Sequence, residues 1–475
     1  MEVIDLPLTG REDRDGLRAF LGAVRQSAEE DGHDKLASIT LVVRKVDPLA
    51  VLDSIYEADA AHFYMEKRAA DKAIAGAEAV DAFVAEGPDR FARLRAFAEE
   101  RLQHTVAIGE LSHPYAGPLF FTGVGFEEEN PRDAAFPPAW CFVPQWQVTA
   151  HGDGTLAVAN ARIEPGQDTE PLVERIWAAH GRFIQLAYDA PPPAPVYHIL
   201  KEEEVGPAGA FAKNVKVALG RIADGRYDKI VLARALDLTF DNPCSPLRIL
   251  GRMRGDYGNC HCFSLQNEEG TSFIGATPEQ LVAVRDGRFT TEAIAGSAPR
   301  SNDPAEDRRF GEELLASDKD RREHRHVVES ILRRLRQAGA DARAPEVPEL
   351  LRLANVQHLR TPLAGGLPED VHLLDLAAAL HPTPAVGGTP RPPALRDITE
   401  LEPFDRGLFA GLVGCFDARG NGEFAVGLRS ALVRRDTARL YAGAGIVAGS
   451  VPEKEHAETS LKMHALLDCI RGAAG

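Results

Sequence analysis

The stretch Lys229-Ile-Val-Leu-Ala-Arg234 places four apolar residues in a row between two basic ones. A short run rich in branched apolar residues, with charge at both ends, is typical of a buried β-strand. A second stretch, Tyr441-Ala-Gly-Ala-Gly-Ile446, alternates small residues and is typical of a strand end. We expect both stretches to form strands.

Glycine in the second stretch, and in Ala295-Gly-Ser297, leaves space beside the backbone. Amide groups exposed in this way can receive a ligand carboxylate. A close-packed strand crossing or a β-bulge uses glycine equally well, so the residues alone leave both interpretations open.

Further strands follow at short intervals on both sides of these stretches. Turns are predicted at Arg285–Arg288 and at Asp417–Gly422, the second leading into a strand around Arg429. Helices are predicted over Asp303–Leu335, with a break, and over Pro452–Arg471. Many strands with helices interspersed, and no regular alternation of the two, favour a layered α+β fold.

The first 190 residues also mix strand-like and helix-like patterns. Leu36–Val46 and Phe142–Ala150 read as strands, and Asp89–Gln103 as an amphipathic helix. The proline-rich run Ala190–Pro195 is a stiff connector and predicts a boundary. We expect an N-terminal region over 1–195, either part of the same α+β fold or an accessory portion, and a catalytic domain over 196–475.

Composition excludes several classes of protein. With 475 residues, 44% hydrophobic and 26% charged, the chain has the profile of a folded globular protein. A net charge of −17 argues against non-specific binding to nucleic acid or to an anionic membrane. The acidic segment Met1–Gly16 has no apolar core typical of a signal peptide. No run of about 18 apolar residues predicts a membrane span.

Six cysteines are present, none in a C-x-x-C pair: Cys141, Cys244, Cys260, Cys262, Cys415 and Cys469. Cys260-His-Cys262 raises the possibility of a metal site, but no second pair stands at zinc spacing. The alternation around it favours a strand with buried thiols, and a reducing cytoplasm is the expected compartment.

Two predicted helices carry acidic pairs three residues apart. These are Asp320 with Glu323, and Glu455 with Glu458, the latter followed by Lys462. Residues at this spacing share one helix face, and carboxylate oxygens are ligands that Mg²⁺ prefers. Basic neighbours leave ordinary surface ion pairing as the other interpretation: Arg321, Arg322 and Lys454.

Ten stretches together resemble the chorismate-utilising enzymes, whose members include isochorismate, salicylate, anthranilate and aminodeoxychorismate synthases. In chain order they cover roughly residues 200–470: KIVLAR, FIGATPEQLV, EAIAGSAPR, LLASDKDRREH, VQHLRTPL, LHPTPAVGG, ELEPFDRGLFAGLVG, GLRSAL, YAGAGIV and AETSLK. The resemblance implies a large antiparallel sheet core with helices outside it, and an active site in a central cleft.

The resemblance also implies roles for individual residues. Lys229 matches a general base that acts on water, and Glu279 a general acid. Glu323 and Glu458 match the two magnesium-binding glutamates. The remaining positions are expected at water-mediated metal contacts (Asp320, Glu455), at cationic groups holding carboxylates (Arg429, Lys462), at backbone lining the substrate (Gly296, Ser297, Gly443, Gly445) and at a site histidine (His358).

These roles require that the pKa values of Lys229 and Glu279 differ from their usual values. A lysine acts as base near neutral pH only with a lowered pKa, and a glutamate acts as acid only with a raised one. Without the resemblance, Lys229 reads as a strand lysine reaching solvent and Glu279 as the start of a helix after Pro278.

Three positions favour isochorismate synthase within the family. Lys229 stands where anthranilate synthases carry glutamine, and Ala295 where some aminodeoxychorismate synthases carry a nucleophilic lysine. Ala385 stands where salicylate synthases tend to carry threonine. The implied reaction is Mg²⁺-dependent addition of water at ring C2 of chorismate, with loss of the C4 hydroxyl.

Other readings remain. Salicylate synthase is the enzymatic alternative, since it also makes isochorismate first. A non-catalytic chorismate-binding scaffold has no reason to retain Lys229, Glu279, Glu323 and Glu458 together. The long N-terminal region favours menaquinone biosynthesis over siderophore biosynthesis. We expect a monomer or homodimer.

Overall fold

The computed structural model describes residues 1–3, 14–129, 134–152, 154–185, 196–352 and 356–473. The helices are α1 (Arg14–Asp31), α2 (Pro48–Ser54), α3 (Arg90–Gln103), α4 (Glu170–Gln185), α5 (Ala210–Ala223), α6 (Pro246–Asp256), α7 (Pro304–Ala316), α8 (Asp318–Gln337), α9 (Leu373–Leu380), α10 (Arg391–Leu401) and α11 (Pro452–Gly472).

The strands of the first half are β1 (Glu2–Val3), β2 (Lys35–Val43), β3 (His62–Lys67), β4 (Lys72–Ala85), β5 (Thr105–Gly109), β6 (Leu119–Val124), β7 (Ala139–His151), β8 (Gly154–Ile163), β9 (Ile199–Glu204) and β10 (Lys229–Phe240). Those of the second half are β11 (His261–Gln266), β12 (Thr271–Thr277), β13 (Gln280–Arg285), β14 (Arg288–Pro299), β15 (Glu349–Arg352), β16 (Val356–Gly366), β17 (Gly388–Thr389), β18 (Leu412–Asp417), β19 (Gly422–Val426), β20 (Ser430–Arg434) and β21 (Thr437–Val447).

The strands form one continuous hydrogen-bonded sheet that divides at β7. Neighbours run in the order β9-β10-β21-β20-β12-β11-β3-β4-β7. The first residues of β7 continue to β6-β18-β19-β13-β14-β16-β15, and its last residues to β8-β2-β5-β1. Only the pairings of β5 with β1 and β2 are parallel among those of the described residues.

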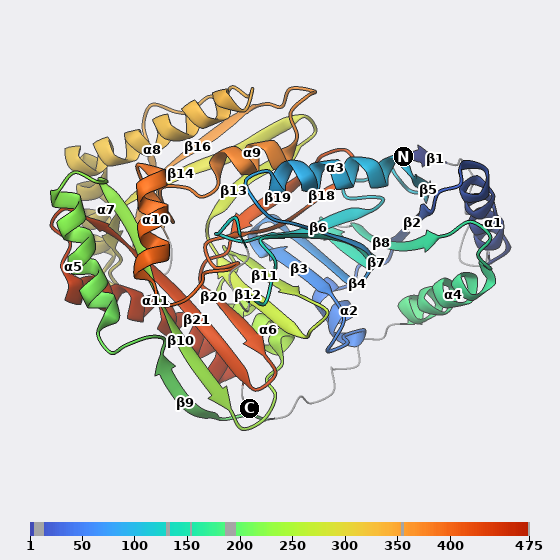
Figure 1. The fold of residues 1–475 in the computed structure, drawn as a ribbon, viewed down its shortest axis with the longest axis horizontal. Helices are drawn as coiled ribbons and strands as arrows, with labels where there is room; N and C mark the ends of the chain where they lie inside the picture. The colour runs from blue at the N-terminus through green and yellow to red at the C-terminus, as the bar shows by residue number, and fades with distance from the viewer. Residues whose placement is uncertain (4–13, 130–133, 153, 186–195, 353–355, 474–475) are drawn as a thin grey trace.

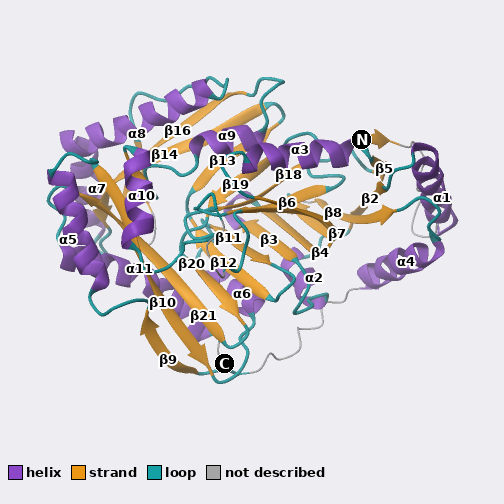
Figure 2. Cartoon of the chain, viewed as in Figure 1, coloured by secondary structure: helices purple, strands orange, loops and turns teal. Residues whose placement is uncertain are grey.

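Helices lie outside this sheet, with α5, α7, α8, α10 and α11 gathered at one end of the molecule and α1 and α4 at the other (Figures 1 and 2). The predicted fold, an antiparallel sheet core with helices outside, is confirmed. The sheet can pack in this way because its inner faces are apolar: β6 and β18 are buried along their whole length.

Strands from both sides of position 195 share the sheet, since β3 pairs with β11 and β6 with β18. Stacked rings join the same parts: Phe120 lies on Phe416 with ring centroids 5.1 Å apart. Such pairs contribute about 0.5–1.5 kcal/mol beyond the area they bury. The connector Ala190–Pro195 lies outside the described residues, so the division at 195 stays a prediction.

Most local expectations agree with the structure. The strands predicted at Leu36–Val46 and Phe142–Ala150 are β2 and β7, and the helix at Asp89–Gln103 is α3. The predicted break in Asp303–Leu335 falls at Ser317, whose hydroxyl accepts a hydrogen bond from the Asp320 amide at 3.2 Å and caps α8.

One local expectation is wrong. Arg429 does not lie in a strand but between β19 and β20, with a φ of 47°. This left-handed conformation turns the chain out of β19 before Ser430 begins β20, and a periodic pattern does not reveal such a residue.

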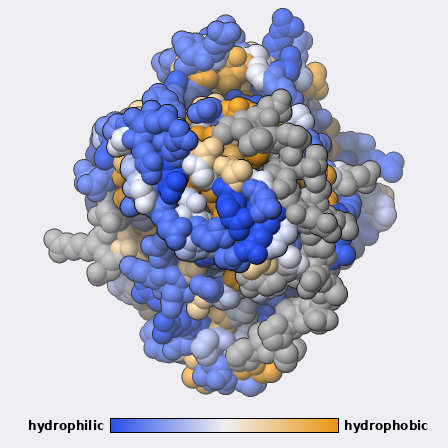
Figure 3. All heavy atoms as spheres, turned by 90° about the vertical axis from the view of Figure 1, so that its right-hand side faces the viewer, coloured by the Kyte–Doolittle hydropathy of each residue, from blue (hydrophilic) through white to orange (hydrophobic). Residues whose placement is uncertain are grey.

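The cysteines agree with the expectation of buried thiols. All six are free and buried, and Cys262 lies within β11. Burial raises the pKa of the Cys262 thiol to about 12, which keeps it protonated at neutral pH. No helix in the described part of the chain is long and apolar enough to cross a membrane. The face that carries α1 and α4 is largely hydrophilic, with apolar residues showing between the polar ones (Figure 3).

Candidate active site

A cavity of about 590 Å³ lies among β10, β14, β21, α8 and α11. Of the fourteen residues predicted for the site, all except Glu455 line it: Lys229, Glu279, Gly296, Ser297, Asp320, Glu323, His358, Ala385, Arg429, Gly443, Gly445, Glu458 and Lys462. These residues span more than 200 positions of sequence, and the fold brings them to one place.

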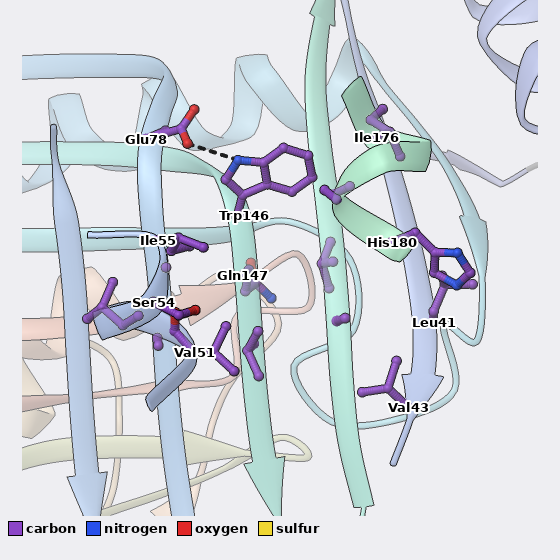
Figure 4. Close-up of a pocket in the computed structure, with 18 of the residues that line it drawn as sticks. Leu41, Val43, Val51, Ser54, Ile55, Glu78, Trp146, Gln147, Ile176 and His180 are labelled. Atoms are coloured by element: carbon purple, nitrogen blue, oxygen red, sulfur yellow. Dashed lines mark hydrogen bonds between the residues drawn. The ribbon is translucent and has the colours of Figure 1, made fainter. Parts of the chain in front are cut away.

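A second cavity, of about 670 Å³, lies against the face of β2, β4, β7 and β8, between α2 and α4 (Figure 4). It contains none of the predicted residues. Its main polar groups satisfy one another, because Glu78 accepts a hydrogen bond from the Trp146 indole at 3.0 Å and pairs with Arg175. Chemistry rather than volume therefore identifies the smaller cavity as the candidate site.

Gly445 of β21 makes room for the side chain of Lys229. Antiparallel pairing sets Val231 opposite Gly445 and Lys229 opposite Val447. A Cβ atom added at Gly445 would lie 3.0 Å from the Cε atom of Lys229, closer than side-chain carbons normally approach. Gly445 thus serves a close approach between side chain and backbone at the cavity wall.

Lys229 begins β10 and lies at the wall of the cavity with a side chain only 22% exposed. Its Nζ atom is 3.9 Å from Oε1 of Glu323. Burial lowers the pKa of Lys229, because a charged ammonium is poorly solvated there. The negative charges of Glu323 and Glu279 oppose this shift but do not reverse it.

Glu279 follows Pro278 in the short link between β12 and β13, so the alternative that it starts a helix is wrong. Its Oε1 atom accepts a hydrogen bond from the Thr383 hydroxyl at 3.3 Å. Burial, with a smaller contribution from the charge of Glu292, raises the pKa of Glu279 to about 7. The carboxyl group can therefore hold a proton near neutral pH, and can also release it.

Acidic residues from two helices line the cavity. Asp320 and Glu323 come from the first turns of α8, and Glu458 from α11. Glu458 is paired with Lys462, whose Nζ lies 2.7 Å from its Oε1 and also donates to the Gly443 carbonyl at 2.9 Å. Two of the acidic residues thus have a lysine partner within the cavity.

This set of oxygen ligands fits Mg²⁺ in its chemistry. The described residues contain no group of three or more His, Cys, Asp or Glu already gathered around one point. Mg²⁺ does not need one, because it usually takes one or two carboxylates and completes its octahedron with water and substrate. Glu455 lies off the cavity wall. Burial and the charge of Glu458 raise its pKa.

Cationic and neutral groups complete the wall. Arg429 and Lys462 both line the cavity and can attract carboxylates. His358 on β16 lies 2.9 Å from the Ser297 hydroxyl, measured from its Nδ1 atom. Burial lowers the pKa of His358 to about 4, so it is neutral at pH 7 and can take part in hydrogen bonds but not in ion pairing.

The sequence also matches a family model described as chorismate binding enzyme, over residues 22–471. The chain belongs to this family. Isochorismate synthase MenF of Bacillus subtilis is 34% identical over 379 residues, covering 79% of this chain and 78% of the relative. The salicylate biosynthesis isochorismate synthase of Pseudomonas aeruginosa is 35% identical over 392 residues, covering 82% and 81%.

A solved structure of a family member agrees along almost the whole chain. It is MenF, the menaquinone-specific isochorismate synthase from Escherichia coli, with a TM-score of 0.76 and 28% identity. The match covers 96% of this chain and 99% of that one. The family expected from the ten motifs is therefore confirmed, and with it the fold.

Sequence reasoning missed two side chains of the candidate site. Thr383 donates a hydrogen bond to Glu279, and Arg406 is a fully buried part of the cavity wall. Both stand inside quoted motifs, HPTPAVGG and ELEPFDRGLFAGLVG. The available signal was their position inside these motifs and, for Arg406, the four-residue spacing from Glu402, with which it forms an ion pair.

Proposed function

We propose that this protein is an isochorismate synthase that converts chorismate to isochorismate. The observation that supports this most directly is the pair Lys229 and Glu279 in one cavity, with pKa values shifted in opposite directions. One shift favours a neutral amine and the other a protonated carboxyl, the forms that a base and an acid need. The names of the relatives given above point to the same activity.

In the proposed reaction, Lys229 takes a proton from a water molecule as the water oxygen bonds to ring C2. The two ring double bonds each shift by one position, and the bond between C4 and its hydroxyl oxygen breaks. Glu279 gives its proton to that departing oxygen, which leaves as water. One water is added and one is released, so the reaction is an isomerisation, and a proton returned from Lys229 to Glu279 restores the site.

The substrate carries two carboxylates, and the cavity has groups for both. Arg429, Lys462 and the backbone at Gly296 and Gly443 line the cavity and would hold them. Glu323 and Glu458 would hold Mg²⁺, which supplies a Lewis acid and a fixed point for the ring carboxylate when bound. Ala295 and Ala385 line the same cavity with small side chains. We assign the product to menaquinone supply, which the full-length similarity to a menaquinone-specific enzyme supports.

Product analysis tests the proposal. The purified protein, given chorismate and Mg²⁺, is expected to accumulate isochorismate without fluorescent salicylate or free pyruvate. Salicylate and pyruvate in equal amounts would instead identify a salicylate synthase. Anthranilate formed on addition of ammonium, or no consumption of chorismate at all, would contradict the assignment.

Magnesium dependence is a separate expected result. Replacing Glu458 with Gln removes one charged oxygen ligand, and the Mg²⁺ concentration for half-maximal activity should rise on the order of tenfold to a hundredfold, the loss of one charge-assisted contact. Glu453→Gln, an exposed change in the first turn of the same helix, is the matched control and should leave it unchanged. Wild-type turnover that persists in excess EDTA would contradict the metal assignment.

A further inference from the structure

We propose that Arg406 is a positioning residue, which fixes the strand of Lys229 against the loop that carries Thr383 and Ala385. The inference rests on the proposed function, because it concerns the alignment of the proposed base and acid. Arg406 lies in the turn after α10 and its side chain is 1% exposed.

The guanidinium joins three segments of the chain. Its Nη2 donates to the Val231 carbonyl at 2.8 Å, two residues beyond Lys229 in β10. Its Nη1 donates to the Val386 carbonyl at 2.9 Å, directly after Ala385. Its Nε and Nη2 donate to the Glu402 carboxylate at 2.8 and 2.6 Å. Each bond needs a donor in a different direction, which the planar fork of arginine supplies and a lysine ammonium does not.

The carboxylate of Glu402 extends the same link. Its Oε1 accepts a hydrogen bond from the Ala233 amide at 2.7 Å, so β10 is held through both a carbonyl and an amide. Lys229, at the start of this strand, is thereby tied to the segment that leads from Thr383 to Val386. Thr383 bonds to Glu279, so a single buried group connects the surroundings of the proposed base and acid.

Two residues of the N-terminal region also contact Arg406 and its neighbour Gly407. The Glu127 carboxylate accepts hydrogen bonds from the Arg406 and Gly407 amides, both at 3.2 Å. The ring of Phe126 lies 4.3 Å from the guanidinium carbon, a cation–π contact. The N-terminal region therefore contacts Arg406 through Phe126 and Glu127, while none of its described residues lines the cavity.

A purely structural role for Arg406 and a positioning role predict different experimental results. Losing a structural pair lowers stability and leaves the turnover of the folded fraction unchanged. Losing alignment lowers kcat at constant substrate affinity, because a displacement of about 1 Å between reacting groups costs on the order of a hundredfold. Arg429 and Lys462, the proposed carboxylate contacts, come from other segments, so KM should change little.

The test compares Arg406→Lys with the wild type at a temperature where both are folded. Turnover of chorismate by Arg406→Lys should fall on the order of a hundredfold, with KM within about threefold. Arg101→Lys is the matched control: Arg101 pairs with Asp34 and Asp81 away from the cavity, and its loss should lower the melting temperature alone. Wild-type kcat in folded Arg406→Lys would overturn the proposal.

If Arg406→Lys does not fold, Glu127→Gln decides in its place. This substitution removes the negative charge of Glu127, the residue of the N-terminal region that contacts Arg406. A kcat reduced tenfold or more at unchanged KM supports the proposal. Wild-type kcat in that variant overturns it. If the proposed function is wrong, the wild-type protein will already form a different product. The kcat ratio of variant to wild type can then be measured on that product, so the two failures are distinguished.

Discussion

Replacing Lys229 with methionine is expected to reduce turnover of chorismate by on the order of 10³- to 10⁴-fold, the upper part of the range for a lost general base. Methionine keeps a long apolar side chain against Gly445 and has no amine. Water then has no group at that position to accept its proton. Steady-state formation of isochorismate, measured at saturating Mg²⁺, checks the result.

Lys229→Met should not lower the thermal stability of the protein, although it lowers activity. The pKa of Lys229 is lowered in the folded protein, so the folded state binds its proton less tightly than the unfolded chain. The charged lysine therefore costs stability at pH 7, and this cost disappears as the pH rises above its unfolded pKa. Lys229→Met should melt at or above the wild-type temperature at pH 7.

Lys216→Met, an exposed change on α5, is the matched control and should leave turnover intact. Turnover within tenfold of wild type in Lys229→Met would remove the assignment of the base. A lower melting temperature would show that the Lys229 amine makes a contact that stabilises the fold more than its pairing with Glu323 does.

The sequence predicts local features of this fold because they depend on neighbouring residues. The strand at Lys229, the two helices with acidic pairs and the turn at Arg285–Arg288 all follow from spacing and residue type. The division of the sheet at β7 does not, since one strand with a continuous pattern pairs with β6 along its first residues and β8 along its last.

Prediction of the candidate site from sequence is limited in the same way, because contacts between residues far apart in the chain are not visible in local patterns. Motif order predicted thirteen residues that line one cavity. Arg406 was missed although Glu402 stands four positions before it, because both residues follow the end of α10 and the contacts that tie Arg406 to the site are far away in sequence. Val231 stands 175 positions before it and Glu127 279 positions before it. Glu455 matches the helical spacing of Glu458 but lies off the cavity wall, whereas Asp320 and Glu323 have the same spacing and both line it. Helical spacing alone therefore does not decide which side chains reach the cavity.

Replacing Glu279 with glutamine is expected to reduce turnover by on the order of 10²- to 10⁴-fold. Glutamine fills the same space and can still accept the hydrogen bond of Thr383, but it has no proton to give at neutral pH. The C4 hydroxyl must then leave without a proton donor. The same product assay checks the loss of rate.

The pH profile distinguishes this cause from simple disruption. In the wild type, kcat/KM requires neutral Lys229 and protonated Glu279, so one proton is shared between two groups. Activity should rise with pH near 7, where the doubly protonated form disappears, and fall again at the pKa of Lys229, below its usual 10.5, where both groups lose their protons.

In Glu279→Gln only Lys229 titrates, so the small remaining activity should rise through the pKa of Lys229 and then stay level. The alkaline fall disappears because no acid is left to lose its proton. Thr383→Val is the companion variant. The hydrogen bond from Thr383 lowers the pKa of Glu279, so its removal should move the lower limb of the bell above 7 while the bell shape persists. An unchanged alkaline fall in Glu279→Gln would assign the acid to another group.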